Sequence, residues 1–160
     1  MDARNSPGAG QDARTIVTTR VIDAPRELVF EAWTNPKHLV QWFGPNGFSV
    51  TIRAIDVRPG GVWRFVMHGP DGVDYENRIV YEEIVKPERL VYSHPGGEDV
   101  EPVQSRVTVT FEEHDGKTKL TMRMLFPSAA ERDRVAEKYG AVEGGKQTLE
   151  RLAEHLATMG

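Results

Sequence analysis

Few side chains in this sequence have the type and spacing that chemistry requires. Cysteine is absent, which excludes disulfides, thiolate nucleophiles and cysteine-ligated metals. The sequence has no Gly-x-Ser-x-Gly elbow, zinc-protease motif or phosphate-binding loop. The histidines lie far apart without the paired spacing of a helical metal site, so each is expected to be structural or exposed: His38, His68, His94, His114 and His155. His68 and His94 are the better candidates for a function, because each lies where a predicted strand meets a turn. We expect no metal and no cofactor.

The remaining charged candidates lie on predicted helix and strand positions. Glu143 and Lys146 flank a pair of glycines, so either could face a cavity and orient a ligand. As an i,i+3 pair they could equally lie on a solvated helix face. Four arginines on predicted strands are expected to point outward, and one turned inward would indicate a carboxylate-bearing ligand: Arg64, Arg78, Arg106 and Arg123.

A long helix predicted over residues 128–158 must position the glycine pair. Ser128 and Glu131 have the capping-box spacing at its start. Apolar residues follow on one face: Val135, Tyr139, Val142, Leu149, Leu152 and Leu156. In the middle of this seam, Gly144 and Gly145 lack bulk. A facing sheet would meet either an empty volume at Gly145 or a close approach of two backbones, and the sequence leaves both open.

The rest of the chain predicts a sheet with one apolar face. Residues 14–22 favour a first strand, and residues 48–126 alternate apolar and polar side chains between Pro- and Gly-rich turns. Two short helices lie between strands one and two. Pro25 is expected to open the first, while Asn35 caps and Pro36 opens the second, which ends at Gly44. The predicted fold class is therefore α+β, with a curved antiparallel sheet of six or seven strands wrapped around the C-terminal helix.

Composition and charge limit the class of protein. The chain has 160 residues, of which 39% are hydrophobic and 28% charged, as in an ordinary globular protein. We expect a disordered lead over residues 1–13 and a single domain over residues 14–158. The formal charge of -4 and the lack of a Lys/Arg cluster argue against nucleic acid as a partner. The absence of a long apolar run and of a signal-peptide core predicts a cytoplasmic protein without a membrane span.

Three stretches carry a resemblance to a known family. They are EAWTNPKHLVQWFGP at residues 31–45, RPGGVWRF at 58–65 followed by GPDG at 69–72, and KPERLVY at 86–92. In this order they resemble the START-like (SRPBCC) superfamily, in the branch of the C-terminal domain of the activator of heat-shock-protein-90 ATPase. The resemblance covers residues 14–157. It implies a helix-grip fold with a deep apolar cavity between the sheet and the C-terminal helix.

The resemblance also implies a range of functions. Relatives bind lipids, hormones or polyketides, and some catalyse cyclisation. We expect binding of a small apolar or amphipathic molecule, with a link to stress response, and a binding protein rather than an enzyme. A polyketide cyclase- or aromatase-like enzyme is one alternative. A chaperone-interacting protein is another, although the chaperone activator has an additional N-terminal domain that the short lead cannot replace. The chain is expected to be a monomer or homodimer.

The expected ligand site combines aromatic and methionine side chains with the glycine region of the helix. Trp42 and Phe43, next to Gly44-Pro45, are expected at the mouth of the cavity. The full set of candidate ligand-binding residues is Trp42, Phe43, Trp63, Phe65, Met67, Tyr75, Met122, Met124, Tyr139, Val142, Glu143, Gly145 and Lys146. Methionine is flexible and polarisable, which suits a cavity for varied apolar shapes, although it also serves as core filler. No catalytic residue is predicted.

Overall fold

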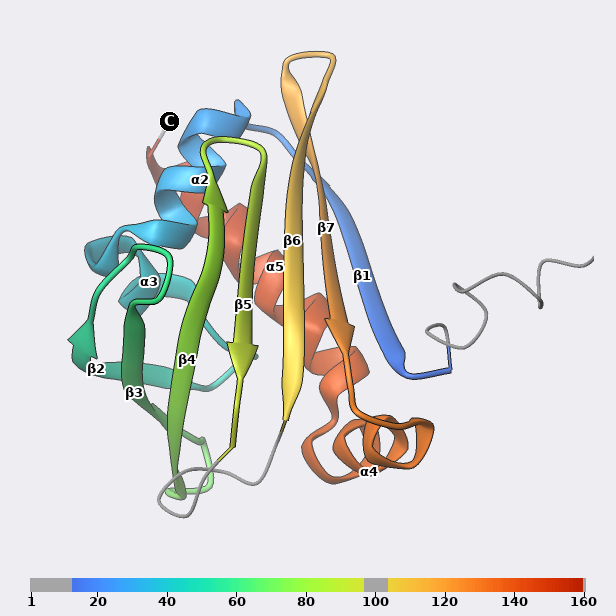
Figure 1. Ribbon diagram of the computed structural model, residues 1–160. Helices are drawn as coiled ribbons and strands as arrows, with labels where there is room; N and C mark the ends of the chain where they lie inside the picture. The colour runs from blue at the N-terminus through green and yellow to red at the C-terminus, as the bar shows by residue number, and fades with distance from the viewer. Residues whose placement is uncertain (1–12, 97–103, 160) are drawn as a thin grey trace, which may run out of the picture.

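The protein is built on one antiparallel sheet, seen here in a computed structural model that describes residues 13–96 and 104–159 (Figure 1). Its strand order is β1-β7-β6-β5-β4-β3-β2. The strands are β1 (Thr15–Ile22), β2 (Ser49–Ile55), β3 (Val62–His68), β4 (Asp74–Val85), β5 (Arg89–His94), β6 (Ser105–His114) and β7 (Lys117–Leu125). Strands β2 to β7 follow one another as a meander, and β1 pairs with β7 to complete the sheet.

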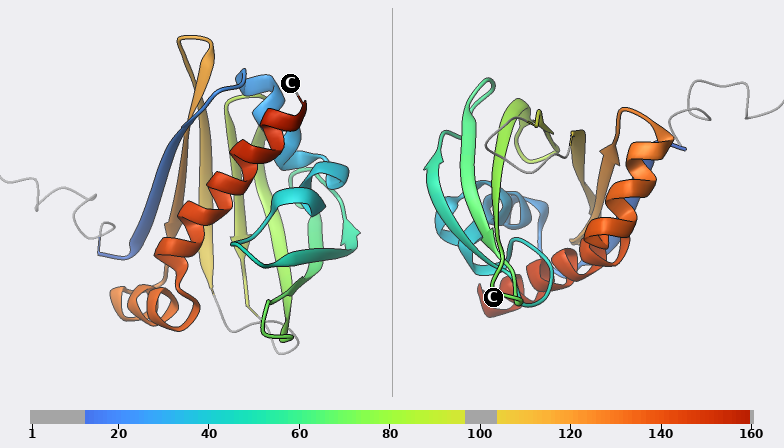
Figure 2. Two further views of the ribbon diagram at one scale, coloured as in Figure 1. Left: turned by 180° about the vertical axis from the view of Figure 1, so that it is seen from behind. Right: turned by 90° about the horizontal axis from the view of Figure 1, so that it is seen from below.

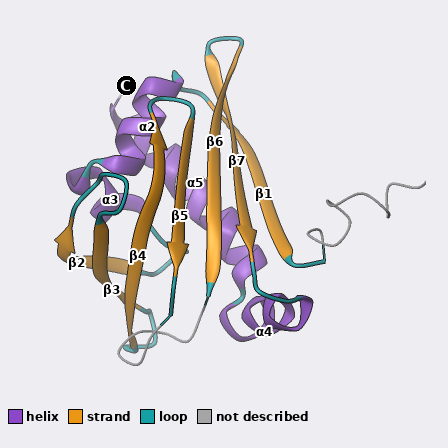
Figure 3. Ribbon diagram, in the orientation of Figure 1, coloured by secondary structure: helices purple, strands orange, loops and turns teal. Residues whose placement is uncertain are grey.

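Helices cover one face of this sheet (Figure 3). They are α2 (Arg26–Thr34), α3 (Pro36–Trp42), α4 (Ala129–Tyr139) and α5 (Ala141–Met159). Helix α5 lies across the concave side of the curved sheet, as Figure 2 shows, with α2 and α3 near its C-terminal end. The seven strands, the two short helices between β1 and β2, and the gripped C-terminal helix confirm the predicted α+β helix-grip fold.

The capping residues predicted from the sequence mark the starts of α3 and α4. The Asn35 side chain accepts a hydrogen bond from the amide of Lys37 at 3.0 Å, and Pro36 opens α3. The Ser128 hydroxyl accepts from the amide of Glu131 at 3.0 Å. The Glu131 carboxylate does not complete the capping box, because it accepts from the Arg134 guanidinium instead. Pro25 precedes α2 as its N-cap residue, one position earlier than predicted.

The prediction of one continuous helix over residues 128–158 is wrong. Gly140 adopts a left-handed conformation, with φ 60° and ψ 40°, and separates α4 from α5. Glycine takes this conformation without the steric cost that a Cβ imposes. Within α5, Leu149, Leu152 and Leu156 are buried, while Val142, in the first turn of the same helix, is 39% exposed. Val142 is therefore not part of the apolar seam.

The core fills the concave side of the sheet. Trp33 packs edge-on against Trp42 and Phe111, and Leu149 of α5 reaches the same cluster. A smaller cluster joins β1 to α4 through Ile16, Phe126 and Val135. Together these clusters hold both helices of the C-terminal segment on the sheet.

The opposite face of the sheet carries the strand arginines. Side chains alternate along a strand, and the neighbours of these arginines point to the core or the cavity. On this outer face Arg106 pairs with Glu82 at 3.0 Å, and Arg78 donates to the carbonyl of Gly96 at 2.7 Å. Arg64 and Arg123 occupy equivalent outward positions beside Phe65 and Met122.

Two further sequence predictions concern the N-terminal lead and membrane-spanning helices. The lead predicted over residues 1–13 lies outside the described residues, apart from Ala13. In the described part of the chain, no helix combines the length and apolar character needed to cross a membrane.

Candidate functional site

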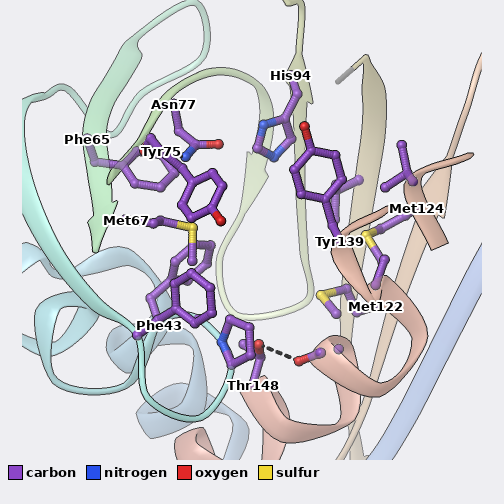
Figure 4. A pocket seen from close by; sticks show the side chains of 18 of the residues that line it. Phe43, Phe65, Met67, Tyr75, Asn77, His94, Met122, Met124, Tyr139 and Thr148 are labelled. Atoms are coloured by element: carbon purple, nitrogen blue, oxygen red, sulfur yellow. Dashed lines mark hydrogen bonds between the residues drawn. The ribbon is translucent and has the colours of Figure 1, made fainter. Parts of the chain in front are cut away.

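A cavity of about 330 Å³ lies between the concave face of the sheet and the C-terminal helices (Figure 4). Its lining is mostly apolar and aromatic, and it lies away from α2, which contributes none of the lining residues. The residues are Phe43, Gly44, Pro45, Phe48, Phe65, Met67, Tyr75, Asn77, Tyr92, His94, Val107, Met122, Met124, Val135, Lys138, Tyr139, Ala141, Gly144, Gly145 and Thr148. The exposed Lys138 and the half-buried Tyr139 mark where the cavity reaches the surface.

Alternate side chains along the strands form the wall of the cavity on the side of the sheet. On β3 and β4, Phe65 is paired with Asn77 and Met67 with Tyr75, and all four face inward. Val107 of β6 lies between Tyr92 on one side and Met124 on the other. Register between neighbouring strands therefore gathers residues that are far apart in the sequence into one surface.

The loop between α3 and β2 forms a second wall and is held against α5. One nitrogen of the Arg151 guanidinium, Nη1, donates to the carbonyl oxygens of Gly44 and Pro45, at 2.9 Å each. The amide of Asn46 donates to Gln147 Oε1 at 3.1 Å. Burial lowers the pKa of Arg151. Gly44 has φ 107°, a conformation that favours glycine, and a Cβ there would displace the terminal methyl group of Met67, which would lie 2.7 Å away.

The glycine pair of α5 is not a gap in the packing. A Cβ on Gly145 would lie 2.9 Å from Thr18 Oγ1 on β1 and 3.4 Å from Met122 Cε. Gly145 therefore allows the helix to approach the sheet closely, and of the two alternatives the empty volume is the wrong one at this position. A Cβ on Gly144 would meet only Pro45, at an ordinary 3.6 Å.

The polar groups of the cavity are concentrated near its outer end. The rings of Tyr75 and Tyr139 approach to 6.5 Å between centroids, from β4 and from the last residue of α4. Burial lowers the pKa of His94 to about 4, so its imidazole is neutral at pH 7. Tyr92 lies deeper, where burial raises the pKa of its phenol, and its hydroxyl has the Trp33 indole as a hydrogen-bond partner.

Eight of the thirteen predicted ligand-binding residues line this cavity: Phe43, Phe65, Met67, Tyr75, Met122, Met124, Tyr139 and Gly145. Two others are core residues behind the wall. Trp42 is fully buried and its Nε1 donates to the carbonyl of Ala32 at 3.0 Å. Trp63 is buried and stacks on Phe65 with ring centroids 4.0 Å apart.

The other three predicted residues, Val142, Glu143 and Lys146, are exposed and do not line the cavity. Glu143 and Lys146 were predicted because they flank the glycine pair, and Val142 because it continues the apolar spacing of Leu149. All three lie in the first two turns of α5 with exposed side chains, so for Glu143 and Lys146 the solvated helix face is the alternative that the structure has.

The predicted ligand-binding set lacks several lining residues, chiefly Asn77, Tyr92 and His94, although His94 was a functional candidate because of its place at a strand end. Strand alternation could have identified them. Asn77 is two residues from Tyr75, and Tyr92 and His94 occupy alternate positions of β5. Thr148, whose hydroxyl donates to the Gly144 carbonyl at 2.7 Å, is polar and so was not part of the apolar pattern, although it is four residues from the buried Leu152.

The other histidines take part in polar contacts away from the cavity. His68 lies between Thr51 Oγ1, 2.7 Å from its Nε2, and Asp74 Oδ1, 2.8 Å from its Nδ1. These three side chains are exposed on the outer face of the sheet. His38 Nδ1 and His155 Nε2 are 3.0 Å apart, where α3 meets α5. Over residues 13–96 and 104–159, no group of three or more acidic or histidine side chains could hold a metal ion.

Known proteins share this fold across almost the whole chain. Ms6760 from Mycobacterium smegmatis is 27% identical, with 94% of this chain and 95% of that one covered and a TM-score of 0.82. NE0264 from Nitrosomonas europaea is 24% identical over 99% and 98% of the chains, with a TM-score of 0.82. The AHSA1 protein SPO3351 from Silicibacter pomeroyi is 21% identical over 91% and 99%, with a TM-score of 0.71.

The family assignment comes from the sequence match. No curated protein matches this chain. The family profile described as "Activator of Hsp90 ATPase homolog 1-like protein" matches residues 23–157. These residues include all three stretches on which the START-like resemblance was based, and the structure has the helix-grip fold that the resemblance implied. The chain therefore belongs to the family of activator of Hsp90 ATPase homolog 1-like proteins.

Proposed function

We propose that this protein binds a small apolar or amphipathic molecule in the cavity between the sheet and helices α4 and α5. The observation that carries the proposal is a cavity of about 330 Å³ lined mainly by aromatic, methionine and aliphatic side chains. Ligand sites in proteins start at roughly this volume and have a similar lining. Apolar cavities of this kind favour apolar ligands over water, because water needs polar partners that such walls do not supply.

The electrostatics of the lining favour binding over catalysis. A general acid or base works best when its pKa lies near the working pH. Burial moves the pKa of His94 down to about 4 and the pKa of Tyr92 upward, so both shifts lead away from neutral pH. The cyclase- or aromatase-like alternative would need ionisable groups whose pKa values are shifted toward neutral pH. The proposal includes a cytoplasmic location, which rests on the sequence alone, and a link to stress response, which rests on family membership alone.

Two neighbouring positions of α5 provide a matched test. Ala141 lines the cavity, whereas Val142 is exposed. We would titrate the wild type, Ala141→Trp and Val142→Trp with the uncharged dye N-phenyl-1-naphthylamine, and compare their melting temperatures. We expect saturable binding by the wild type and by Val142→Trp, and at least a roughly tenfold loss in Ala141→Trp, because the indole occupies ligand volume.

Two results would contradict the proposal. One is the absence of saturable dye binding by the wild type, together with native mass spectrometry that finds no small molecule retained. The other is equal dye affinity in a folded Ala141→Trp protein, which would place any bound dye elsewhere. If the indole lowers the melting temperature strongly, Ala141→Leu fills less volume and serves in its place.

A further inference from the structure

We propose that the ligand of this cavity is an uncharged aromatic or alicyclic molecule with one hydroxyl or carbonyl group, and that His94 and Asn77 recognise that group. This inference rests on the proposed function and specifies the chemical class of its ligand. It follows from where the polar atoms of the cavity lie, how they are already bonded, and which charges are near them.

His94 and Asn77 lie on the same face of two neighbouring strands. Val80 of β4 is paired with Ser93 of β5, so His94 lies beside Ile79 and diagonally from Asn77. Diagonal neighbours on one face of a sheet are close enough for both side chains to contact one small group. Figure 4 shows both side chains pointing into the cavity, with the His94 ring between Asn77 and Tyr139.

Both side chains retain hydrogen-bonding capacity toward the cavity. Asn77 Nδ2 donates to the carbonyl of Tyr75 at 3.0 Å, which leaves the amide oxygen as an acceptor. The His94 ring packs against Tyr92, with centroids 6.0 Å apart, and makes no side-chain hydrogen bond to the described residues. A neutral imidazole has one donor and one acceptor nitrogen. Together the two side chains can accept a hydrogen bond from a hydroxyl or donate one to a carbonyl.

The charges of the described lining residues argue against an ionic ligand group beside His94. Burial keeps the imidazole uncharged at pH 7, so it cannot neutralise a carboxylate. Lys138 is the one Lys, Arg, Asp or Glu among the described lining residues. It is exposed, and its ammonium lies 5.3 Å from the centroid of the Tyr139 ring, at the outer end of the cavity. A carboxylate next to His94 would therefore be desolvated without a countercharge from the described lining residues, which is costly.

The apolar part of the lining suits the body of such a molecule. Phe43, Phe65, Met67 and Met122 contribute aromatic rings and thioethers. Aromatic faces and polarisable sulfur both contact flat ring systems favourably. We infer that the ligand lies with its ring system against these residues and its hydroxyl or carbonyl toward His94.

Three probes that share one ring system test this inference: naphthalene, 2-naphthol and 2-naphthoate. Their dissociation constants would be measured at pH 7 for the wild type, His94→Leu and His114→Leu, the last being an exposed control histidine. In the wild type we expect 2-naphthol to bind about tenfold more tightly than naphthalene, as one desolvated hydrogen bond provides, and 2-naphthoate to bind most weakly. His94→Leu should abolish the preference for 2-naphthol and leave naphthalene binding nearly unchanged, and His114→Leu should change neither.

The outcomes separate this inference from the proposed function. If naphthalene and 2-naphthol bind equally well, or if His94→Leu leaves their ratio unchanged, the recognition by His94 is wrong while cavity binding stands. If 2-naphthoate binds most tightly and Lys138→Met abolishes that binding, the ligand class is anionic and the inference is overturned. If none of the probes binds, the proposed function fails as well. Asn77→Leu, expected to reduce the same 2-naphthol preference, replaces His94→Leu if that variant does not fold.

Discussion

Two adjacent glycines of α5 should respond differently to the same substitution. Alanine in place of glycine stabilises a helix by roughly 1 kcal/mol through backbone entropy alone. At Gly144 the new Cβ would lie 3.6 Å from Pro45 Cγ, an ordinary contact, so the full gain should appear. At Gly145 the same atom would lie 2.9 Å from Thr18 Oγ1, closer than a Cβ can pack, and 3.4 Å from Met122 Cε.

The difference between the two variants isolates the steric cost, because the gain in helix propensity is common to both. Thr18 is buried, and its branched side chain has restricted χ1 rotation, so it cannot easily turn away. Overpacking of this kind typically costs about 1–3 kcal/mol. Gly145→Ala should therefore be about 1–3 kcal/mol less stable than Gly144→Ala.

Urea unfolding, followed by fluorescence of the three tryptophans, measures this difference. Trp33, Trp42 and Trp63 are all buried, so their emission reports on the core. Adding Thr18→Ala to Gly145→Ala should recover most of the loss, and a double-mutant cycle gives the coupling free energy between the two sites. If Gly145→Ala is as stable as Gly144→Ala, or more so, then Gly145 does not mediate a close approach to β1.

Four further predictions use other parts of the structure. Leu149→Ala should lower the free energy of unfolding in urea by roughly 2–5 kcal/mol, because Leu149 is fully buried; a loss below about 0.5 kcal/mol would contradict its place in the core. Arg151→Met should lower the free energy of unfolding in the same assay by about 1–3 kcal/mol, because it leaves the carbonyls of Gly44 and Pro45 without their hydrogen-bond donor; an unchanged value would show that these two hydrogen bonds do not stabilise the protein. Because the folded-state pKa of His94 is lowered from 6.5 to about 4, its contribution to stability is present above pH 6.5 and is lost as the pH falls toward 4. The stability loss between pH 7 and pH 5 should thus be about 1–2 kcal/mol smaller in His94→Gln than in the wild type or in His114→Gln, and equal losses would refute the shift. Treatment with a chelator should leave the melting temperature unchanged, and a drop reversed by one divalent ion would show a metal site.

Most of the fold could be predicted from local patterns in the sequence. Alternation along residues 48–126, with Pro- and Gly-rich turns between, indicates antiparallel strands because each signal acts between residues close in the chain. Asn35 and Ser128 mark helix starts for the same reason, since a capping side chain bonds an amide two or three residues away. The one-sided apolar sheet then requires a helical cover, which the C-terminal segment provides.

The candidate site was predictable only where strand alternation alone determines the inward direction. Phe65, Met67, Met122 and Met124 line the cavity as strand alternation indicates, and His94 follows the same rule, although it was a candidate only for its place at a strand end. Trp42 and Trp63 are equally apolar but lie behind the wall. Hydrophobicity cannot distinguish a residue that lines a cavity from one that fills the core next to it, because both are removed from water.

Only the tertiary structure decided the geometry of the helical wall. Residues 128–158 contain three glycines in different settings: Gly140 breaks the helix, Gly144 has room for a Cβ beside Pro45, and Gly145 has no room for one beside Thr18. Their sequence contexts do not separate these settings, because each depends on a partner more than a helical turn away or on the conformation of the whole segment. The packing of Leu149, Leu152 and Leu156 in the core orients α5, so that Ala141 and Thr148 face the cavity while Glu143 and Lys146 face solvent. A periodic pattern specifies the residues that share a face, but packing against the sheet determines where the period starts.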